Sequence, residues 1–564
     1  MKLHIEKNKS RAIRLLTGIC LSATLWACSD SFLDLKDPNN FGDDKFWRNK
    51  ADAESGLAAA YSPIKFQMNG YYGAFDGWLN LNSRGDDIFT ILNEEASMWD
   101  IATFQNSATT GNDPYGQLYT GIQRANVVLK YIDQVPEAGI SAADRNMIRD
   151  EALVLRAYQY FLLVNNYGQV PLRLKPSSDE GQLMPKADEA TIWAQIETDL
   201  QAAINDGNLP VARSSSEKGR LEQGAAITIL AKVYEAQHKY EAAKPLLQNF
   251  IADNYGPGKR YQLMDNFADN FTPTHKNNAE SVFELQYSSD GDLTWGNEDG
   301  TKMGNSIPQF VGPAISGGWA KLMPSAFAVS EFAKETRGSS AQVDSKYDKR
   351  MYASLFFTPS DYGDWVSADN GWYSPQFYGG LYSMQDLWDG NSSKMAGGAP
   401  TYTVSGANGA MNGQFLLKKY TAYWVNSKSA DSMGNKEGKS NNLRILRFDE
   451  VLLMYAEACA QTNDAAQANW ALNEIRHRAG LPEKTFAAAD LMAEVEHQCL
   501  LEFFGEGHRF DDLRRWYSVN KIQLIFKDNE KQGASNFQRK HLYYPIPSGE
   551  LNNNKAMTQN DLWQ

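Results

Sequence analysis

The sequence predicts a mainly α-helical protein: an irregular superhelix of paired helices, interrupted by a long, loop-rich insertion with many aromatic residues. Two observations lead to this fold class. Segments with helical periodicity and helix-stop residues occur in pairs in both halves of the chain. Between them, from about Gly256 to Lys439, helical periodicity is sparse, and Gly, Ser, Asn and aromatic residues dominate.

The first helical pair is predicted in the N-terminal half. Residues 146–166 are apolar on nearly every face, as expected for a buried helix, and they stop just before Gly168. Residues 222–238 place apolar and small side chains on one stripe, and a second helix starting near His238 packs back on it. Pro245 would strain this second helix unless it falls in the first turns, because proline has no amide donor.

A similar arrangement recurs near the C-terminus, where we expect helices over residues 449–461, 465–479 and 491–504. Paired helices of this length, each burying one face on the next, are typical of tetratricopeptide-like stacking. No strict repeat length is visible. The fold class is therefore mainly α, with irregular tetratricopeptide-like helical hairpins forming an α-α superhelix.

The middle of the chain has the composition of a functional surface. Long irregular segments inside a compact protein usually carry function rather than scaffolding. We therefore expect a helical scaffold over residues 46–255 and 440–564, and a loop-rich ligand-binding insertion over residues 256–439. Six of the fourteen tryptophans lie in this insertion: Trp295, Trp319, Trp365, Trp372, Trp388 and Trp424.

The N-terminus has the pattern of a secretion signal. Five basic side chains within residues 2–14 precede a short apolar run over residues 15–26. As a helix this run would span about 18 Å, too short for the roughly 30 Å hydrocarbon core of a bilayer. No later apolar stretch is long enough to span a membrane either.

The end of this signal predicts a lipid anchor. Residues 25–28 read Leu-Trp-Ala-Cys, which resembles a bacterial lipobox, although Trp26 stands where a small residue is usual. We expect residues 1–27 to be a lipoprotein signal peptide and Cys28 to carry the lipid. Residues 28–45 would form the lipidated tether, and several acyl chains would hold a soluble body firmly at a membrane.

The net charge restricts the class of ligand. The whole chain carries −13, and removing residues 1–27, with five basic side chains and one acidic, changes this to −17. Nucleic acid binding depends on neutralising phosphates, so we expect no nucleic acid partner. Neutral ligands fit better than strongly anionic ones.

Metal and nucleotide sites have little support. There is no CxxC and no Cys/His cluster, and Cys459 and Cys499, which lie in helical patterns, are predicted to be buried thiols rather than a disulfide. Residues 290–300 supply oxygen ligands but not in the order of an EF-hand, so we do not expect calcium. Residues 434–440 resemble a P-loop with one residue too few, and we interpret them as a solvated loop.

One segment has the mixture of side chains that a sugar requires. A pyranose packs its C–H face on an aromatic ring, while its hydroxyls need amide, carboxylate or guanidinium partners. Residues 71–87 combine these groups and offer Tyr71, Tyr72, Asp76, Trp78, Asn80, Asn82 and Arg84, of which Tyr72, Asp76, Trp78 and Asn80 are the candidate ligand-binding residues. Any single tryptophan is as often a core residue; the set as a whole favours some rings being exposed for ligand.

A dense group of charges at residues 509–515 is interpreted as structural. Asp511 and Arg515 are spaced i,i+4, and Asp512 and Arg515 are spaced i,i+3, so both carboxylates can reach Arg515 on one helix face. An ion-pair lock explains this group better than a ligand site does.

Eight ordered segments carry a family resemblance. Four C-terminal ones are RFDEVLLMYAEACAQ, ALNEIRHRAGLP, LLEFFGEGHRFDDLRRW and LYYPIPSGELNNNKAMTQNDLW, within residues 447–563. Four others, within residues 46–234, are FWRNKADAESGLAAAYSPI, YTGIQRANVVLKYID, EALVLRAYQYFLLVNNYGQVPL and GRLEQGAAITILAKVY. Together they resemble the SusD/RagB family of Bacteroidetes outer-membrane nutrient-binding lipoproteins, over almost the whole mature chain.

This resemblance implies a SusD-like domain over residues 46–564 and a function. Such proteins are lipid-anchored, surface-exposed helical lids over a SusC-like TonB-dependent barrel transporter of the outer membrane. They bind oligosaccharides or similar nutrients on an aromatic surface, deliver them to the transporter, and use no catalysis and no cofactor. By the same resemblance, Trp78 is expected to act with Trp295 and Trp319, and Trp372 and Tyr373 are further candidates.

The residues alone leave two other function classes open. One is a lipid-anchored helical-repeat scaffold that binds peptides or proteins, which an apolar or charged concave groove would favour. The other is a glycosidase, which needs two carboxyl groups facing each other across a cleft. No GxSxG elbow or HExxH motif occurs, so enzymatic activity has no motif in its support.

Overall fold

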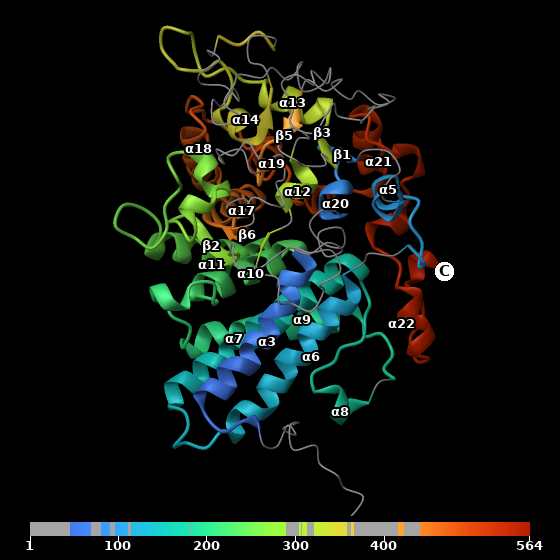
Figure 1. The fold of residues 1–564 in the computed structure, drawn as a ribbon. Coiled ribbons are helices and arrows are strands. Elements are labelled where there is room, and N and C mark those ends of the chain that lie inside the picture. Colours follow the sequence, from blue (N-terminus) through green and yellow to red (C-terminus); the bar gives the residue numbers. More distant parts are fainter. Residues whose placement is uncertain are drawn as a thin grey trace, which may run out of the picture.

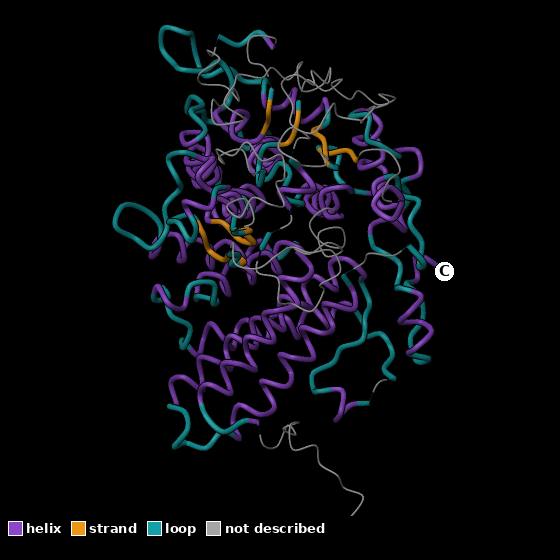
Figure 2. Tube along the Cα trace, viewed as in Figure 1, coloured by secondary structure: helices purple, strands orange, loops and turns teal. Residues whose placement is uncertain are grey.

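The computed structural model describes the chain in ranges. Helices dominate these ranges, and strands are few and short (Figure 2). Every helix in them falls short of the length and apolar character that crossing a bilayer requires. The described residues are 46–68, 80–90, 96–110, 114–181, 183–288, 304–305, 307–312, 321–357, 362–365, 415–421 and 440–564.

The longer helices form one continuous stack. Each packs against the next in chain order, from α3 to α19, and α17 is the first helix after the predicted insertion. In Figure 1, α3, α6, α7 and α9 lie side by side, and the stack continues through α10 and α11 toward α17. This arrangement confirms the predicted tetratricopeptide-like superhelix. The helices are α3 (Lys50–Met68), α6 (Tyr115–Tyr131), α7 (Ala142–Tyr167), α9 (Glu189–Asp206), α10 (Gln223–Ala236), α11 (Tyr240–Asn254), α17 (Phe448–Gln461), α18 (Ala465–Arg478) and α19 (Leu491–Glu502).

Helix α7 shows how the sequence sets the length of the central helix. The side chain of Ser141 accepts a hydrogen bond from the amide of Asp144 at 3.1 Å and so caps the first turn. Gly168, with a φ of 68°, ends the helix as predicted. The helix begins four residues before the predicted start at residue 146, because the capping serine lies upstream of the apolar pattern. Most of its residues are buried, as its sequence indicated.

Two hairpins of the stack close with the same turn. His238 between α10 and α11, and Asn463 between α17 and α18, both have φ near +58°. In each turn the next amide bonds back to a carbonyl five residues earlier, Lys239 to Tyr234 and Asp464 to Cys459, both at 2.8 Å. The shared turn is an internal repeat that the varied sequence hides.

Pro245 lies in the second turn of α11 and removes one amide donor without ending the helix, which continues to Asn254. In the C-terminal stack, α17 and α19 carry Cys459 and Cys499. Both are buried free thiols, as predicted, and burial raises the pKa of Cys459 to about 11.

Three two-stranded antiparallel ladders complete the described fold. The longest pairs β2 with β6, in the register Ser281 opposite Arg447 and Leu285 opposite Leu443. These strands lie on either side of most of the predicted insertion, so its two ends meet. The strands are β1 (Ile88–Thr90) with β3 (Leu322–Pro324), β2 (Ser281–Leu285) with β6 (Leu443–Arg447), and β4 (Leu355–Phe356) with β5 (Leu416–Leu417).

Shorter helices flank the stack. A small second core joins α20 and α21 to Phe104 at the end of α5, around the rings of Phe510, Phe526 and Phe537. The shorter helices are α4 (Asn80–Ser83), α5 (Ala96–Ala102), α8 (Ser177–Glu180), α12 (Ile307–Val311), α13 (Ala326–Phe332), α14 (Lys349–Ser354), α20 (Arg509–Trp516), α21 (Val519–Asp528) and α22 (Ser548–Asn553).

A buried cluster of charges lies where the two ends of the insertion meet the C-terminal helices. Glu280, Asp449 and Glu502 have carboxyl oxygens within 4.8 Å of one another, and all three are buried. Such a cluster could suggest a metal site, but buried guanidinium groups already supply the opposite charge. The ion pairs include Arg447 with Glu280 at 3.0 Å and with Asp449, Arg478 with Glu280 at 3.1 Å and with Glu502, and Arg350 with Glu502 at 2.9 Å.

The pKa of Glu502 shows how strongly the surrounding arginines favour its ionised form. Burial raises it, but the charges of Arg478, Arg350 and Arg447 outweigh burial and lower it to about 2. A carboxyl whose folded pKa lies below its unfolded pKa contributes stability above the unfolded value, and that contribution is lost as the pH falls toward the folded value.

We expect Glu502→Gln to lower the free energy of unfolding by about 3–5 kcal/mol at pH 7, because it leaves buried guanidinium charge uncompensated. The loss should shrink as the pH falls from about 4.5 to about 2, where the wild-type carboxyl also becomes neutral. Urea unfolding at pH 7 and pH 3 measures both effects. Glu483→Gln, at an exposed position, is the matched control, and an equal loss at the two pH values would contradict the assignment.

Candidate functional site

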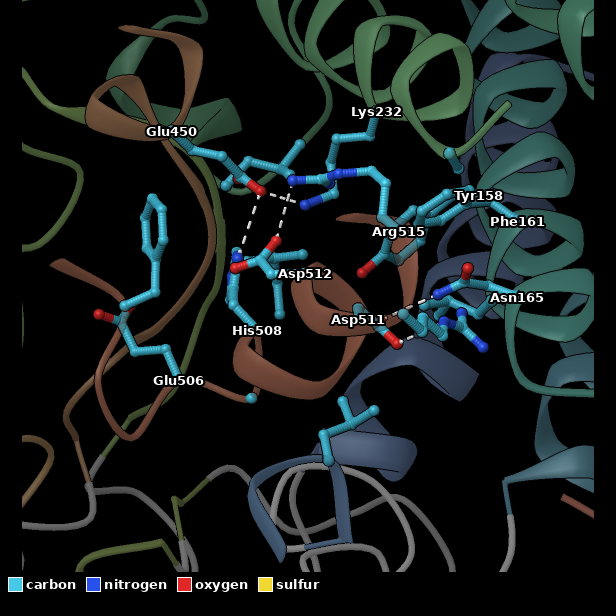
Figure 3. Close-up of a pocket in the computed structure, with 18 of the residues that line it drawn as sticks. Tyr158, Phe161, Asn165, Lys232, Glu450, Glu506, His508, Asp511, Asp512 and Arg515 are labelled. Carbon is cyan, nitrogen blue, oxygen red and sulfur yellow. Dashed lines mark hydrogen bonds and ion pairs between the residues drawn. The ribbon is translucent and has the colours of Figure 1, made fainter. Parts of the chain in front are cut away.

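A cavity of about 280 Å³ lies between the helical stack and the C-terminal segment. Its described walls come from α7, α9 and α10 on one side and from β6, α17 and α20 on the other. Leu81 of α4 also lines it, and Figure 3 shows Lys232, Glu450, His508 and Asp512 gathered at its polar wall. The cavity therefore joins parts of the chain that are far apart in sequence.

Helix α20 supplies most of the polar wall. Its first turn carries Asp511 and Asp512 and its last turn Arg514 and Arg515, an order that complements the helix dipole. Asp512 pairs with Arg515 at 3.1 Å, as predicted. Asp511 pairs instead with Arg514, at 3.2 Å, so the predicted Asp511–Arg515 pair is replaced by an i,i+3 pair.

Asp511 also connects the two sides of the cavity. Its Oδ2 accepts a hydrogen bond of 2.9 Å from the side chain of Asn165, on α7 (Figure 3). Arg514 donates a further bond of 3.0 Å to the carbonyl of Leu542. The charged turn is thus a lock between the stack and the C-terminus, and its residues also line the cavity.

The opposite end of the polar wall is built on Glu450, at the start of α17. Its carboxylate pairs with Lys232 of α10 and lies 3.6 Å from Nδ1 of His508. Burial lowers the pKa of His508 well below its ordinary value, and the nearby positive charge of Lys232 lowers it further. His508 is therefore neutral at neutral pH, and Lys232 provides the positive charge beside Glu450.

Behind this wall three carboxyl groups share one guanidinium. Arg515 pairs with Glu457 at 2.7 Å and with Asp512, and lies 3.8 Å from Glu235. Neither carboxyl oxygen of Glu235 accepts a hydrogen bond from a described residue. Burial, and then the charge of Glu457, raise the pKa of Glu235 well above its ordinary value, so Glu235 holds a proton at neutral pH.

We expect Glu235→Gln to stabilise the protein by at least about 1 kcal/mol at pH 8. A raised folded pKa gives stability that is complete below the unfolded pKa and is lost as the pH rises toward the folded pKa, and glutamine avoids this loss. Thermal unfolding at pH 5 and pH 8 measures the difference. Glu457→Gln is the matched comparison and should destabilise, because Glu457 accepts bonds from Arg515 and Tyr240. A Glu235→Gln protein that is less stable than wild type at both pH values would refute this protonation.

Aromatic rings form the remaining wall. Phe161 and Trp193 meet edge to face with centroids 6.1 Å apart, and Tyr158 lies beside them, almost fully buried. Tyr543 donates a hydrogen bond of 3.2 Å from its hydroxyl to Glu189 across the same side. The cavity thus combines flat apolar faces with polar groups, a combination suited to a ligand that has both.

The formal charges of the wall balance, and burial raises the pKa of one of its carboxyl groups, that of Asp512, to about 7. Five Lys and Arg residues and five carboxylates are among the described lining residues. Glu450, Glu506, Asp511 and Asp512 each pair with a cation. The same lining contains no described serine, threonine or cysteine, so it offers binding groups rather than a hydroxyl or thiol nucleophile.

Most of the predicted ligand-binding residues cannot be compared with this cavity. Asn80 is described: it begins α4 and is buried, with 2% exposure. Cys28 and the segments 290–300 and 434–439 lie outside the described residues. So do the other seven candidates, Trp78, Trp295, Trp319, Tyr72, Asp76, Trp372 and Tyr373.

The second half of the predicted sugar-binding segment is a structural anchor. Arg84 donates a hydrogen bond of 2.6 Å to the carbonyl of His541, and Asp86 pairs with Arg509 at 2.6 Å. Lys531 donates to the carbonyl of Ser83 at 3.0 Å. These buried contacts hold α4, directly after residues 71–79, against the C-terminal segment.

Sequence reasoning missed most of the cavity. Lys232, Glu450 and Asn165 lie in segments that were predicted to be helical scaffold, and only Asp511 and Asp512 carried a signal, as part of the charged turn. Asn165 and Asp511 are 346 residues apart, so no local sequence pattern could predict their hydrogen bond.

Comparison with known proteins shows similarity to one family over most of the chain. The model of the SusD family matches residues 279–563, and a model described as starch-binding associating with outer membrane matches residues 31–234. A SusD-like protein of Formosa agariphila is 22% identical over 97% of this chain and 98% of its own length.

Solved structures agree over nearly the same extent. A SusD superfamily protein from Bacteroides vulgatus superposes with a TM-score of 0.73 and 25% identity, over 92% of this chain and all of that one. A laminarin binding SusD-like protein superposes with a TM-score of 0.71 and 25% identity, over 91% of this chain and all of that one. Because the family model covers half of the sequence and the fold agrees from end to end, this chain belongs to the SusD family.

Proposed function

We propose that this protein is a cell-surface lipoprotein that binds neutral oligosaccharides and delivers them to a TonB-dependent outer-membrane transporter. The observation that supports this most is the end-to-end similarity to a laminarin binding SusD-like protein. Laminarin and starch are both neutral glucans, and the net charge of −13 suits a neutral ligand. SusD family proteins are not catalytic, so the prediction that this chain is no enzyme is confirmed.

The proposed binding surface is built on Trp78 and Trp319. Trp78 lies two residues before α4, and Trp319 lies three residues before β3. β3 pairs with β1, and β1 packs against α4. Both tryptophans are therefore close in sequence to elements that contact one another in the described fold. Trp295, Trp372, Tyr373 and the polar residues Tyr72, Asp76 and Asn80 complete the proposal.

We expect Trp78→Ala and Trp319→Ala each to weaken glycan binding about tenfold, because each removes a flat ring that covers a sugar face. Affinity electrophoresis against a panel that includes laminarin and starch measures this. Trp470→Ala is the matched control: Trp470 is 37% exposed on scaffold helix α18. Wild-type binding by both loop variants would remove these residues from the site, and release of reducing sugar would contradict a purely binding role.

The anchoring proposal rests on Cys28 and its distance from the body. Phe46, the first described residue, lies eighteen positions after Cys28. Fully extended, the chain between them spans at most about 65 Å. A lipid at Cys28 would therefore fasten the body while leaving it room to move over a membrane partner.

We expect Cys28→Ala to move the protein from the membrane fraction to the soluble fraction and to abolish labelling by radioactive palmitate. Cys459→Ala should leave both properties unchanged, since that thiol is buried in α17. Copurification with a barrel transporter, measured in the same cells, tests the proposed partner. Continued palmitate labelling of the Cys28→Ala protein would show that another residue carries the lipid.

A further inference from the structure

The cavity beside α20 is formed mostly by other residues than the proposed aromatic surface. Its described walls come from scaffold helices, from β6 and from the segment 503–515, whereas the proposed surface depends on residues 71–79 and on the insertion. Two described wall residues connect the cavity to those segments: Leu81, close to residues 71–79, and Tyr420, within the insertion. Two sites on this molecule can therefore be separated by substitution.

The size of the cavity limits its occupant. About 280 Å³ is at the lower edge of the roughly 300–1,000 Å³ that small-molecule pockets span. A single sugar ring fits a cavity of this volume, whereas an extended oligosaccharide does not. The occupant is therefore smaller than the ligand proposed for the aromatic surface.

The charge balance of the wall selects a neutral molecule. Lys232 pairs with Glu450, Arg514 with Asp511, and Arg515 with Asp512. An ionic ligand would meet a charge of its own sign in each of these pairs, while a neutral one can add hydrogen bonds to them, because a carboxylate accepts about four.

Unsatisfied donors indicate that hydrogen bonds are missing from this wall. Among the described residues, neither Nη2 of Arg514 nor Nε of Arg515 has a hydrogen-bond partner, although both atoms are buried. Both residues line the cavity. Both atoms have almost no accessible surface, so an acceptor such as a hydroxyl oxygen pairs with them only when these side chains shift toward the cavity.

The other wall suits the apolar face of a ring. Phe161, Trp193 and Tyr543 line it, and Trp193 is only partly buried. A pyranose has hydroxyls in its plane and C–H groups on its faces, so it matches a polar wall opposite an aromatic one.

From these observations we propose that the cavity is a second carbohydrate site, which takes a single neutral sugar ring. The choice of a sugar rests on the proposed function, while the position of the site rests on the geometry alone. In this arrangement ring hydroxyls donate to Asp511, whose side chain is 34% exposed, Arg514 and Arg515 turn toward the ring, and Phe161 and Trp193 cover the opposite face.

Filling the cavity tests this directly. Ala236, the last residue of α10, lines the cavity, and a tryptophan there would occupy its volume. Ala242→Trp is the matched control, since Ala242 is exposed on α11 and is not among the described lining residues. The probes are glucose, the monomer of the glucans that similar proteins bind, and a laminarin oligosaccharide, both followed by titration calorimetry.

We expect wild type and Ala242→Trp to bind glucose, and Ala236→Trp to bind it at least tenfold more weakly. All three should bind the laminarin oligosaccharide at the aromatic surface. Thermal unfolding establishes that each variant is folded, and Leu81→Phe, which fills the cavity from the other side, replaces Ala236→Trp if that protein is unstable.

Two results would overturn the inference while leaving the proposed function intact. One is oligosaccharide binding by wild type with no glucose binding. The other is glucose binding by a folded cavity-filled variant equal to that of wild type. If wild type binds neither oligosaccharide nor glucose, the proposed function itself fails, and the second site fails with it.

Discussion

Three carboxyl groups that meet in the interior, those of Glu280, Asp449 and Glu502, impose the main constraint on this fold. Like charges so close together are tolerated only where opposite charges surround them and hydrogen bonds complete the shell. Arg350, Arg447 and Arg478 provide both. These guanidinium groups come from α14, from β6 and from α18, so the cluster forms only when those elements are correctly placed. It is a condition for assembling the C-terminal half of the stack.

The position of this charge cluster also matters for the proposed function. The cluster lies at the β2–β6 ladder, where the scaffold gives way to the predicted insertion, and α19 and α20 continue from it toward the cavity. The side chains beside the cavity are rigid because they pair with one another across three helices. A rigid scaffold that presents variable loops is a common way to combine stability with recognition.

The sequence predicts the scaffold well because its signals are local. The helix-stop at Gly168 and the apolar face of α17 act within a few residues. Errors arose where a distant group decides. Asp511 pairs with Arg514 and not with the predicted Arg515. It also accepts a hydrogen bond from Asn165, on a helix far away in the chain. Asn80 has the right chemistry for a sugar and stays a candidate, but its buried place at the start of α4 is set by packing that the local sequence does not specify.

The cavity could not be predicted for the same reason. Its walls are mostly parts of helices. The hydrophobic periodicity of a helix sequence shows which face of the helix is buried, but it does not show which polar side chains of neighbouring helices meet there. Glu235 is an example: its place on an otherwise apolar helix looks like an ordinary charged position, yet three carboxyl groups gather around Arg515 only in the folded chain. Periodicity determines the face of a helix, whereas tertiary contacts determine its chemistry.

The β2–β6 ladder has an evolutionary consequence. The chain leaves the scaffold at Leu285 and returns at Leu443, directly opposite, while Arg350 of α14 ties the segment between them to Glu502 of α19. Loops of this segment can lengthen, shorten or be exchanged with little effect on the helices, provided that α14 keeps its place. The entropic cost of closing a loop grows only slowly with its length. Descendants of one scaffold can therefore acquire new nutrient preferences through changes in those loops that leave α14 in place.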